Sequence, residues 1–291
     1  MSTDPGSPPS SRVAWDAAEP PGGARDGGVV LPLRNGEVAP TATDLARAVA
    51  TGQETTLVVL NAVCFPQQTP LDLPTHLLED HDDAVADVRE TIATTTPGLE
   101  TSGTVLVGHD RARLLARAVD EYDYEAVVLD ETWYEHWLTP LVRTPLESLA
   151  TTVDCPVALP ASGRVDETVA SVLVPVAGGQ HSDAAVDIAR AIAASYDACI
   201  DLLHVTTGGD EAGTGEQLLD DHLARLDAVD DSDTWLLEAD GVEAAIVEQS
   251  RYYDVTVVGA PRTKRLRRFV FGSTSRTIEA DGSNAIVTVW Q

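Results

Sequence analysis

Short apolar runs alternate along the chain with longer segments in which apolar residues recur every three or four positions. The runs are rich in Val and Leu, which is typical of strands buried on both faces of a parallel sheet. The intervening segments, such as the one with Leu219, His222 and Leu226, are typical of crossover helices. Strands are predicted at 29–33, 56–62, 104–107, 126–129 and 157–159, and again at 171–176, 199–204, 234–237, 255–258 and 285–289.

These strands form two sets because the sequence repeats itself. A shift of 143 positions places Val30-Leu31-Pro32-Leu33 on Leu173-Val174-Pro175-Val176, and a shift of 129 places Tyr124-Glu125 on Tyr253-Asp254. A repeat of this kind indicates two α/β units, each with its own sheet. We predict a disordered tail rich in Pro, Gly and Ser at 1–27, a first domain at 28–160, a linker at 161–168 and a second domain at 169–291.

The charge is strongly negative: 47 acidic and 19 basic residues give a net charge of −28, and Lys264 is the only lysine. At molar salt the screening length falls to about 3 Å, so the carboxylates no longer repel one another strongly. The composition therefore predicts a salt-rich cytosol, as in a halophilic archaeon. An acidic surface disfavours nucleic acid as a partner.

No apolar run approaches the ~20 residues that span a bilayer, and residues 1–28 lack a signal-peptide pattern, so we expect a cytoplasmic protein without membrane insertion. Cys64, Cys155 and Cys199 stand apart from one another, which favours small buried residues over a zinc site or disulfides.

One segment of this acidic chain is strongly basic. Five basic residues lie between Gly259 and the run Gly272-Ser273-Thr274; they are Arg262, Lys264, Arg265, Arg267 and Arg268. Small residues free backbone amides for an anion, and a helix that begins near Ser273 would add the positive end of its dipole. The alternative is a solvated loop whose arginines pair with carboxylates. Because surface pairs contribute only ~0 to 1 kcal/mol each, the clustering favours an anionic ligand or an acidic partner surface.

Other candidate motifs are weaker. The segment Gly208–Gly215 has the glycines of a dinucleotide fingerprint, but its acidic residues oppose phosphate, so a flexible connection is predicted. Asp110 is expected to cap a helix, His109 to lie on the surface, and His204 to end a buried strand. No Ser/His/Asp or Cys/His arrangement and no Walker lysine is present, so we expect no catalytic site.

The strand Val172–Val176, the strand end Leu202–Val205, and Val257–Ala260 followed by Gly272-Ser273 resemble the universal stress protein family, in a tandem form over Gly28 to Gln291. The resemblance implies two Rossmann-like domains of the adenine nucleotide alpha hydrolase type. Each is expected to be a five-stranded parallel sheet in the order 3-2-1-4-5 with helices on both faces. It also implies pairing through the last strands, as an intramolecular pseudo-dimer or a homodimer, and a non-enzymatic stress-response role with a regulatory protein partner.

Many members of the family bind ATP through Gly-x2-Gly-x9-Gly-Ser/Thr and an aspartate after the first strand. The matching positions here are Gly259, Arg262, Gly272 and Ser273, and Ala177 stands at the aspartate position. The resemblance implies ATP or another adenine nucleotide as ligand, with Thr274 as a further hydroxyl and Arg262 and Lys264 as countercharges. Arg262 either blocks the cradle or supplies a bidentate phosphate partner, and both alternatives stay open.

The first half departs further from the motif. Under the shift of 129, its positions are Asp130, Trp133 and Arg143, and Arg34 stands at the aspartate position. We therefore predict that residues 28–160 bind no nucleotide. The aromatic group of Trp133, Tyr134, His136 and Trp137 either fills the vacated pocket, which is the simpler account, or contacts a partner. A second hypothesis makes the whole chain a ligand-free interaction module, and a third, a nucleotide-hydrolysing enzyme, lacks a positioned base or metal cluster.

Overall fold

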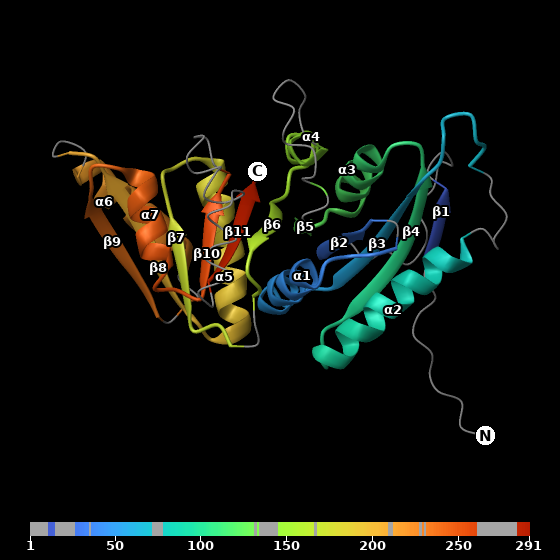
Figure 1. The fold of residues 1–291 in the computed structure, drawn as a ribbon, viewed down its shortest axis with the longest axis horizontal. Helices are drawn as coiled ribbons and strands as arrows, with labels where there is room; N and C mark the ends of the chain where they lie inside the picture. Colours follow the sequence, from blue (N-terminus) through green and yellow to red (C-terminus); the bar gives the residue numbers. More distant parts are fainter. Residues whose placement is uncertain are drawn as a thin grey trace.

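The computed structural model describes one eleven-stranded sheet with helices on both faces (Figure 1). The described residues are 11–14, 27–34, 36–71, 78–130, 133, 145–165, 168–208, 212–226, 229, 231–260 and 284–291.

Ten of the eleven strands, five in each half of the chain, are the ten predicted strands, which are confirmed; the eleventh, β1 (Ser11–Ala14), precedes them. The first half contains β2 (Val29–Leu33), α1 (Pro40–Gly52), β3 (Leu57–Cys64), α2 (Glu79–Thr95), β4 (Thr101–Gly108), α3 (Arg111–Tyr122), β5 (Ala126–Val128), α4 (Pro145–Ala150) and β6 (Val157–Ser162). The second half contains β7 (Ser171–Pro175), α5 (Gln180–Tyr196), β8 (Cys199–Thr206), α6 (Ala212–Leu223), the 3-10 turn η3 (Ala224–Leu226), β9 (Ser232–Glu238), α7 (Val242–Ser250), β10 (Val255–Gly259) and β11 (Ala285–Trp290).

The two halves share one strand order. It is β4-β3-β2-β5-β6 in the first half and β9-β8-β7-β10-β11 in the second, which is 3-2-1-4-5 in both. Neighbouring strands within each half are parallel, whereas β6 and β11 pair antiparallel, with Trp290 opposite Val157 and Thr288 opposite Leu159. The last strands therefore join the halves into an intramolecular pseudo-dimer.

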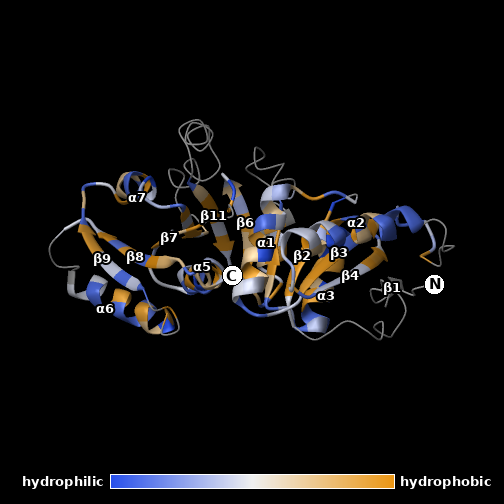
Figure 2. Ribbon diagram, turned by 90° about the horizontal axis from the view of Figure 1, so that it is seen from below, coloured by the Kyte–Doolittle hydropathy of each residue, from blue (hydrophilic) through white to orange (hydrophobic). Residues whose placement is uncertain are grey.

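Three apolar clusters hold the layers together. The largest extends across both halves on the face of the sheet that carries α1, α2, α5 and α6. On the other face, one cluster joins α3 and α4 to the first half, and a smaller one joins α7 to the second half. Figure 2 shows the same distribution, with hydrophobic colour along the strands and hydrophilic colour on the outer faces of the helices. The buried strands agree with the continuous apolar runs of the sequence.

A close helix contact reinforces the join between the halves. Helices α1 and α5 pack side by side, and a Cβ atom built on Gly52 would lie only 1.7 Å from the carbonyl oxygen of Ala191. No side chain fits in that space, so glycine at position 52 permits the backbones to approach. The helices can then share the large cluster beneath the seam formed by β6 and β11.

Short parts of the predicted tail and linker form regular structure. Ser11–Ala14 form β1, a short strand that pairs parallel with Thr104–Val107 of β4, although residues 1–27 were expected to be disordered. A sheet edge exposes unpaired N–H and C=O groups, and these can order a segment whose own pattern is weak. Likewise, β6 continues to Ser162, inside the predicted linker at 161–168, because pairing with β11 extends it.

Two smaller expectations were also wrong. Helix α6 begins at Ala212, within the segment expected to be a flexible connection, and Gly215 lies where a Cβ atom would approach the ring of His204 to 2.7 Å. The glycine thus brings the helix close to β8 and does not loosen the chain. Cys155 is buried as expected, but Cys64 is exposed at the end of β3.

Candidate functional site

Most of the predicted phosphate site lies outside the described residues. This holds for Arg262, Lys264, Arg265, Arg267, Arg268, Gly272, Ser273 and Thr274, which fall within 261–283. Gly259 is described and is the last residue of β10. The role of the basic cluster thus remains a prediction, and the described part of the candidate site consists of the residues around Gly259.

A cavity of about 340 Å³ opens beside Gly259. Its floor comes from the carboxyl ends of three strands, namely 175–178 after β7, 203–205 in β8 and 258–260 at β10. Its walls come from His181 and Ser182 at the start of α5, and from Val242, Glu243 and Ile246 of α7. Most of these side chains are apolar, and the polar groups are few, which is the usual composition of a small-molecule pocket.

The strand order explains why the cavity lies at this place. Strand β7 pairs with β8 on one side and with β10 on the other. Helix α5, which connects β7 to β8, packs on one face of the sheet, and α7, which precedes β10, packs on the other. In open α/β sheets such a switch point leaves a crevice at the carboxyl ends of the strands. The position of the cavity is therefore a consequence of the 3-2-1-4-5 order.

Glycines shape two sides of this crevice. Gly178 and Gly179 have φ values of +78° and +83°, which lets the chain turn sharply from β7 into α5. A Cβ atom on Gly259 would lie 2.7 Å from the carbonyl oxygen of His181. Glycine at this position therefore allows the end of β10 to lie against the first turn of α5, whose positive dipole end faces the same region.

Backbone contacts fix the two histidines that line the cavity. Nδ1 of His204 donates to the carbonyl oxygen of Val176 at 2.8 Å, so its Nε2 is left as an acceptor when the ring is neutral. Nδ1 of His181 accepts from the backbone N–H of Gln291 at 3.1 Å. His204 is thus a strand-end histidine, as predicted, and it also borders the cavity, which no local pattern indicates.

Ser182 has a local role. Its hydroxyl accepts from the N–H of Ala177 at 3.1 Å and lies 3.4 Å from the carbonyl oxygen of Gly178, to which it donates. The side chain therefore ties the turn after β7 to the first turn of α5. Ala177, at the position where the family has an aspartate, is exposed and lines the cavity without adding a charge.

The matching place in the first half is filled. Leu60, Ala62 and Leu129 are the counterparts of Leu203, Val205 and Val258, which line the cavity. All three pack in one buried cluster with Trp133, whose side chain is only 5 % exposed. The burial of Trp133 agrees with the simpler of the two accounts, in which the aromatic group fills the vacated pocket. Asp130 is also buried there, while Tyr134, His136 and Trp137 lie outside the described residues.

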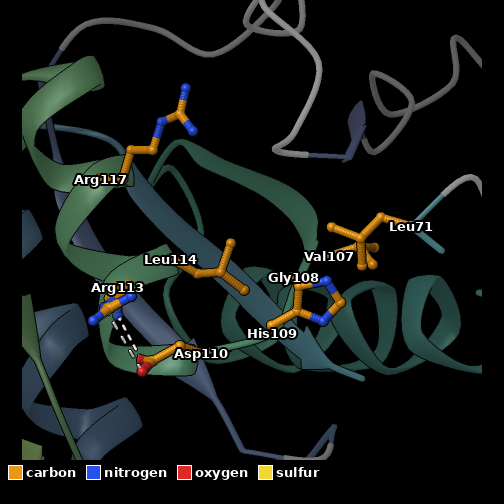
Figure 3. Close-up of a pocket in the computed structure, with 8 residues that line it drawn as sticks. All are labelled: Leu71, Val107, Gly108, His109, Asp110, Arg113, Leu114 and Arg117. Carbon is orange, nitrogen blue, oxygen red and sulfur yellow. Dashed lines mark hydrogen bonds and ion pairs between the residues drawn. The ribbon is translucent and has the colours of Figure 1, made fainter. Parts of the chain in front are cut away.

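A second, smaller cavity of about 180 Å³ lies in the first half at the end of β4 (Figure 3). Figure 3 shows Leu71, Val107 and Leu114 around it, with Arg113 turned toward Asp110. Asp110 caps α3 as predicted, because its Oδ1 accepts from the N–H of Arg113 at 3.0 Å. The cavity is two strands away from β2 and so is not the counterpart of the larger one.

Two solved structures of universal stress proteins are similar to this fold. A universal stress protein from Archaeoglobus fulgidus superposes with a TM-score of 0.55 at 13 % identity, over 91 % of this chain and 96 % of that one. A universal stress protein candidate from Pseudomonas aeruginosa gives 0.54 at 14 % identity, over 91 % and 93 %. The fold is therefore that of a tandem universal stress protein.

This fold is not restricted to one role. The cytoplasmic domain of a prokaryotic cation chloride cotransporter superposes on the chain with a TM-score of 0.56 at 11 % identity, over 91 % of this chain and 96 % of that domain. No protein-family model matches the sequence, and no curated protein matches it. The likeness thus fixes the tandem universal stress protein fold, and the function has to be argued from the site.

Two features are absent from the described residues. None of their helices is long and apolar enough to cross a bilayer. No group of three or more His, Cys, Asp or Glu side chains among them is arranged to hold a metal ion.

Proposed function

We propose that the chain is a non-enzymatic, cytoplasmic universal stress protein that binds ATP or another adenine nucleotide in its second half. The observation that carries the proposal is the cavity at the switch point beside Gly259. It has apolar walls for a planar base, a helix N-terminus that favours negative charge, and two imidazoles held in place by the backbone.

The basic cluster supplies the reason to expect phosphate. In the sequence it begins at Arg262, two residues after Ala260, which lines the cavity. Gly259, Gly272, Ser273 and Thr274 are the proposed amide and hydroxyl donors, with Arg262 and Lys264 as countercharges. The first half is proposed to bind no nucleotide, since Trp133 packs against the counterparts of the cavity walls.

A regulator needs its ligand to change an equilibrium. The nucleotide would have to bind one conformation or assembly of the chain more tightly than another, because only differential affinity shifts populations. The proposed consequence is altered association with a regulatory protein partner. The stress protein role follows from this scheme together with the shared tandem fold.

Calorimetry in multimolar KCl with ATP, AMP and inorganic phosphate tests the ligand. ATP at 100 times its dissociation constant should stabilise the protein by about 2.7 kcal/mol, measured as a rise in Tm. The variant Ala177→Trp, which places an indole at the mouth of the cavity, should lose this response. Ala86→Trp is the matched control, because Ala86 is an exposed alanine on α2 in the other half.

Three outcomes decide the proposal. Absence of binding at millimolar ATP would contradict it, and so would equal binding by wild type and Ala177→Trp. Steady release of inorganic phosphate from ATP that disappears in Ala177→Trp would make the protein an enzyme, against the non-enzymatic part of the proposal.

A second candidate function is a ligand-free interaction module. It is favoured by the likeness to the cytoplasmic domain of a cation chloride cotransporter, where the same fold is a part of a transporter. Under this alternative both halves lack nucleotide, and the chain regulates a partner by contact alone. A null result in calorimetry, with a partner that co-purifies stoichiometrically, would favour it.

A further inference from the structure

The two outer edges of the sheet differ. At one end β1 covers β4, and at the other end β9 is the last strand (Figure 1). In the described part of the chain no strand pairs with the outer side of β9. An uncovered edge presents a row of N–H and C=O groups that can pair with another strand.

The internal repeat shows that these are equivalent edges. Leu60 lies opposite Thr104, and its counterpart Leu203 lies opposite Trp235. The stretch Thr104–Val107, which β1 covers, therefore corresponds to Trp235–Glu238. Thr104 is 5 % exposed and Trp235 is 55 % exposed, so the same place is buried in the first half and open in the second.

The chemistry around β9 is acidic and partly apolar. Eight acidic residues and no lysine or arginine lie between Arg225 and Arg251. Asp233 and Glu238 are exposed on the strand itself; Asp233 shares a face of the sheet with the exposed Trp235, and Glu238 lies on the other face. If a partner strand with basic side chains added to this edge, its charge would complement the acidic residues around β9. It would also make apolar contact with the indole of Trp235.

We propose that the outer edge of β9 binds an extended segment of a partner protein as an additional parallel strand, and that this segment carries arginine or lysine beside small apolar residues. Addition of a strand to a sheet edge is a general mode of peptide recognition, in which backbone pairing gives affinity and side chains give specificity. The chain contains its own precedent, because Ser-Arg-Val-Ala at 11–14 pairs parallel with the equivalent edge. This inference does not depend on a ligand in the cavity.

A labelled peptide tests the edge directly. The probe is fluorescein attached to Ser-Ser-Arg-Val-Ala-Trp, the sequence of residues 10–15, and the readout is fluorescence anisotropy with the full chain. Wild type should bind the probe saturably. Trp235→Lys should weaken binding at least tenfold, since a lysine on an edge strand opposes strand addition. A probe with glutamate in place of its arginine should also bind more weakly.

Tyr252→Lys is the matched control. Tyr252 is 74 % exposed, lies outside β9, and its replacement changes the charge by the same amount. It should bind the probe like wild type, and Trp235→Phe should retain binding within about threefold because the aromatic contact is kept. Circular dichroism before each titration verifies that every variant is folded.

Several results would overturn the proposal. They are no saturable binding to wild type, equal binding by Trp235→Lys and wild type, or equal weakening by Tyr252→Lys. If the peptide bound by displacing β1 from β4, Trp235→Lys and wild type would bind it equally. A dimer of the chain that Trp235→Lys disperses would assign the edge to a second copy and would equally refute a partner strand.

Discussion

The two halves of the chain have the same strand order but different contents at the carboxyl ends of their strands. In the first half Trp133 packs with Leu60 and Leu129, and in the second half the counterparts of those leucines border a cavity. The backbone framework is shared, so the difference arises from a few side chains placed on it. A fold therefore supplies a location for a site, and the residues at that location decide whether a site exists.

Removal of the filling side chain should have the largest effect. We expect Trp133→Ala to lower the free energy of unfolding by about 4 kcal/mol, because it leaves a cavity in a buried cluster. Urea denaturation measures the loss. Trp235→Ala is the matched control from the second half, where the indole is 55 % exposed, and should change stability by less than about 1 kcal/mol. Similar losses in both variants would break the contrast between a filled and an open half.

The next largest effect is expected where α1 and α5 pack together at the join between the halves. Gly52→Ala should cost about 3 kcal/mol, because its Cβ atom would overlap the carbonyl oxygen of Ala191 and push α1 away from α5. Gly213→Ala, in α6, has open space around the new methyl group and should instead stabilise the chain by about 1 kcal/mol. Denaturation curves of both variants check the prediction, which fails if Gly52→Ala is as stable as wild type.

The smallest effect on stability is expected at Tyr253, which corresponds to Tyr124 in the first half. The hydroxyl of Tyr253 donates to Asp201 at 2.5 Å, and burial together with this hydrogen bond raises the pKa of Tyr253 above its ordinary value of 10.0. Burial likewise raises the pKa of its counterpart Tyr124, next to Tyr122. A raised pKa means that the folded state favours the protonated phenol. The stabilisation is therefore complete below pH 10 and is lost as pH rises through the folded pKa.

We expect Tyr253→Phe to cost about 1 kcal/mol at pH 8, and the difference from wild type to shrink above pH 10. Chemical denaturation at pH 8 and pH 11 measures both values. Tyr252→Phe serves as the control, because Tyr252 is exposed and should change stability little at either pH. A cost for Tyr253→Phe that stayed constant between the two pH values would show that ionisation of the phenol is not involved.

Much of the fold could be predicted because it depends on local patterns. Buried parallel strands are continuous apolar runs, so Val29–Leu33 and Ala285–Trp290 are visible in the sequence. The cap at Asp110 follows from its place before a helical pattern. The filling role of Trp133 could be inferred because the repeat aligns it with a motif position.

The remainder depends on contacts between distant segments. Strand β1 is ordered by the edge of β4, and no pattern within Ser11–Ala14 indicates this. The cavity needs the ends of β7, β8 and β10 and the start of α7 together, so no single motif could predict its size or its lining by His204. Among the described strands, β9 has an uncovered edge, and this likewise becomes visible only when both halves are placed in one sheet.

The antiparallel pairing of β6 with β11 within one polypeptide has a consequence for division of labour. Two identical subunits joined through such strands would have to carry the same pockets, so a tryptophan that plugged one would plug both. Covalent linkage removes this constraint and holds the halves together at an effective concentration that dilution cannot lower. One half can therefore serve as a scaffold, while the other retains a cavity that can hold a ligand.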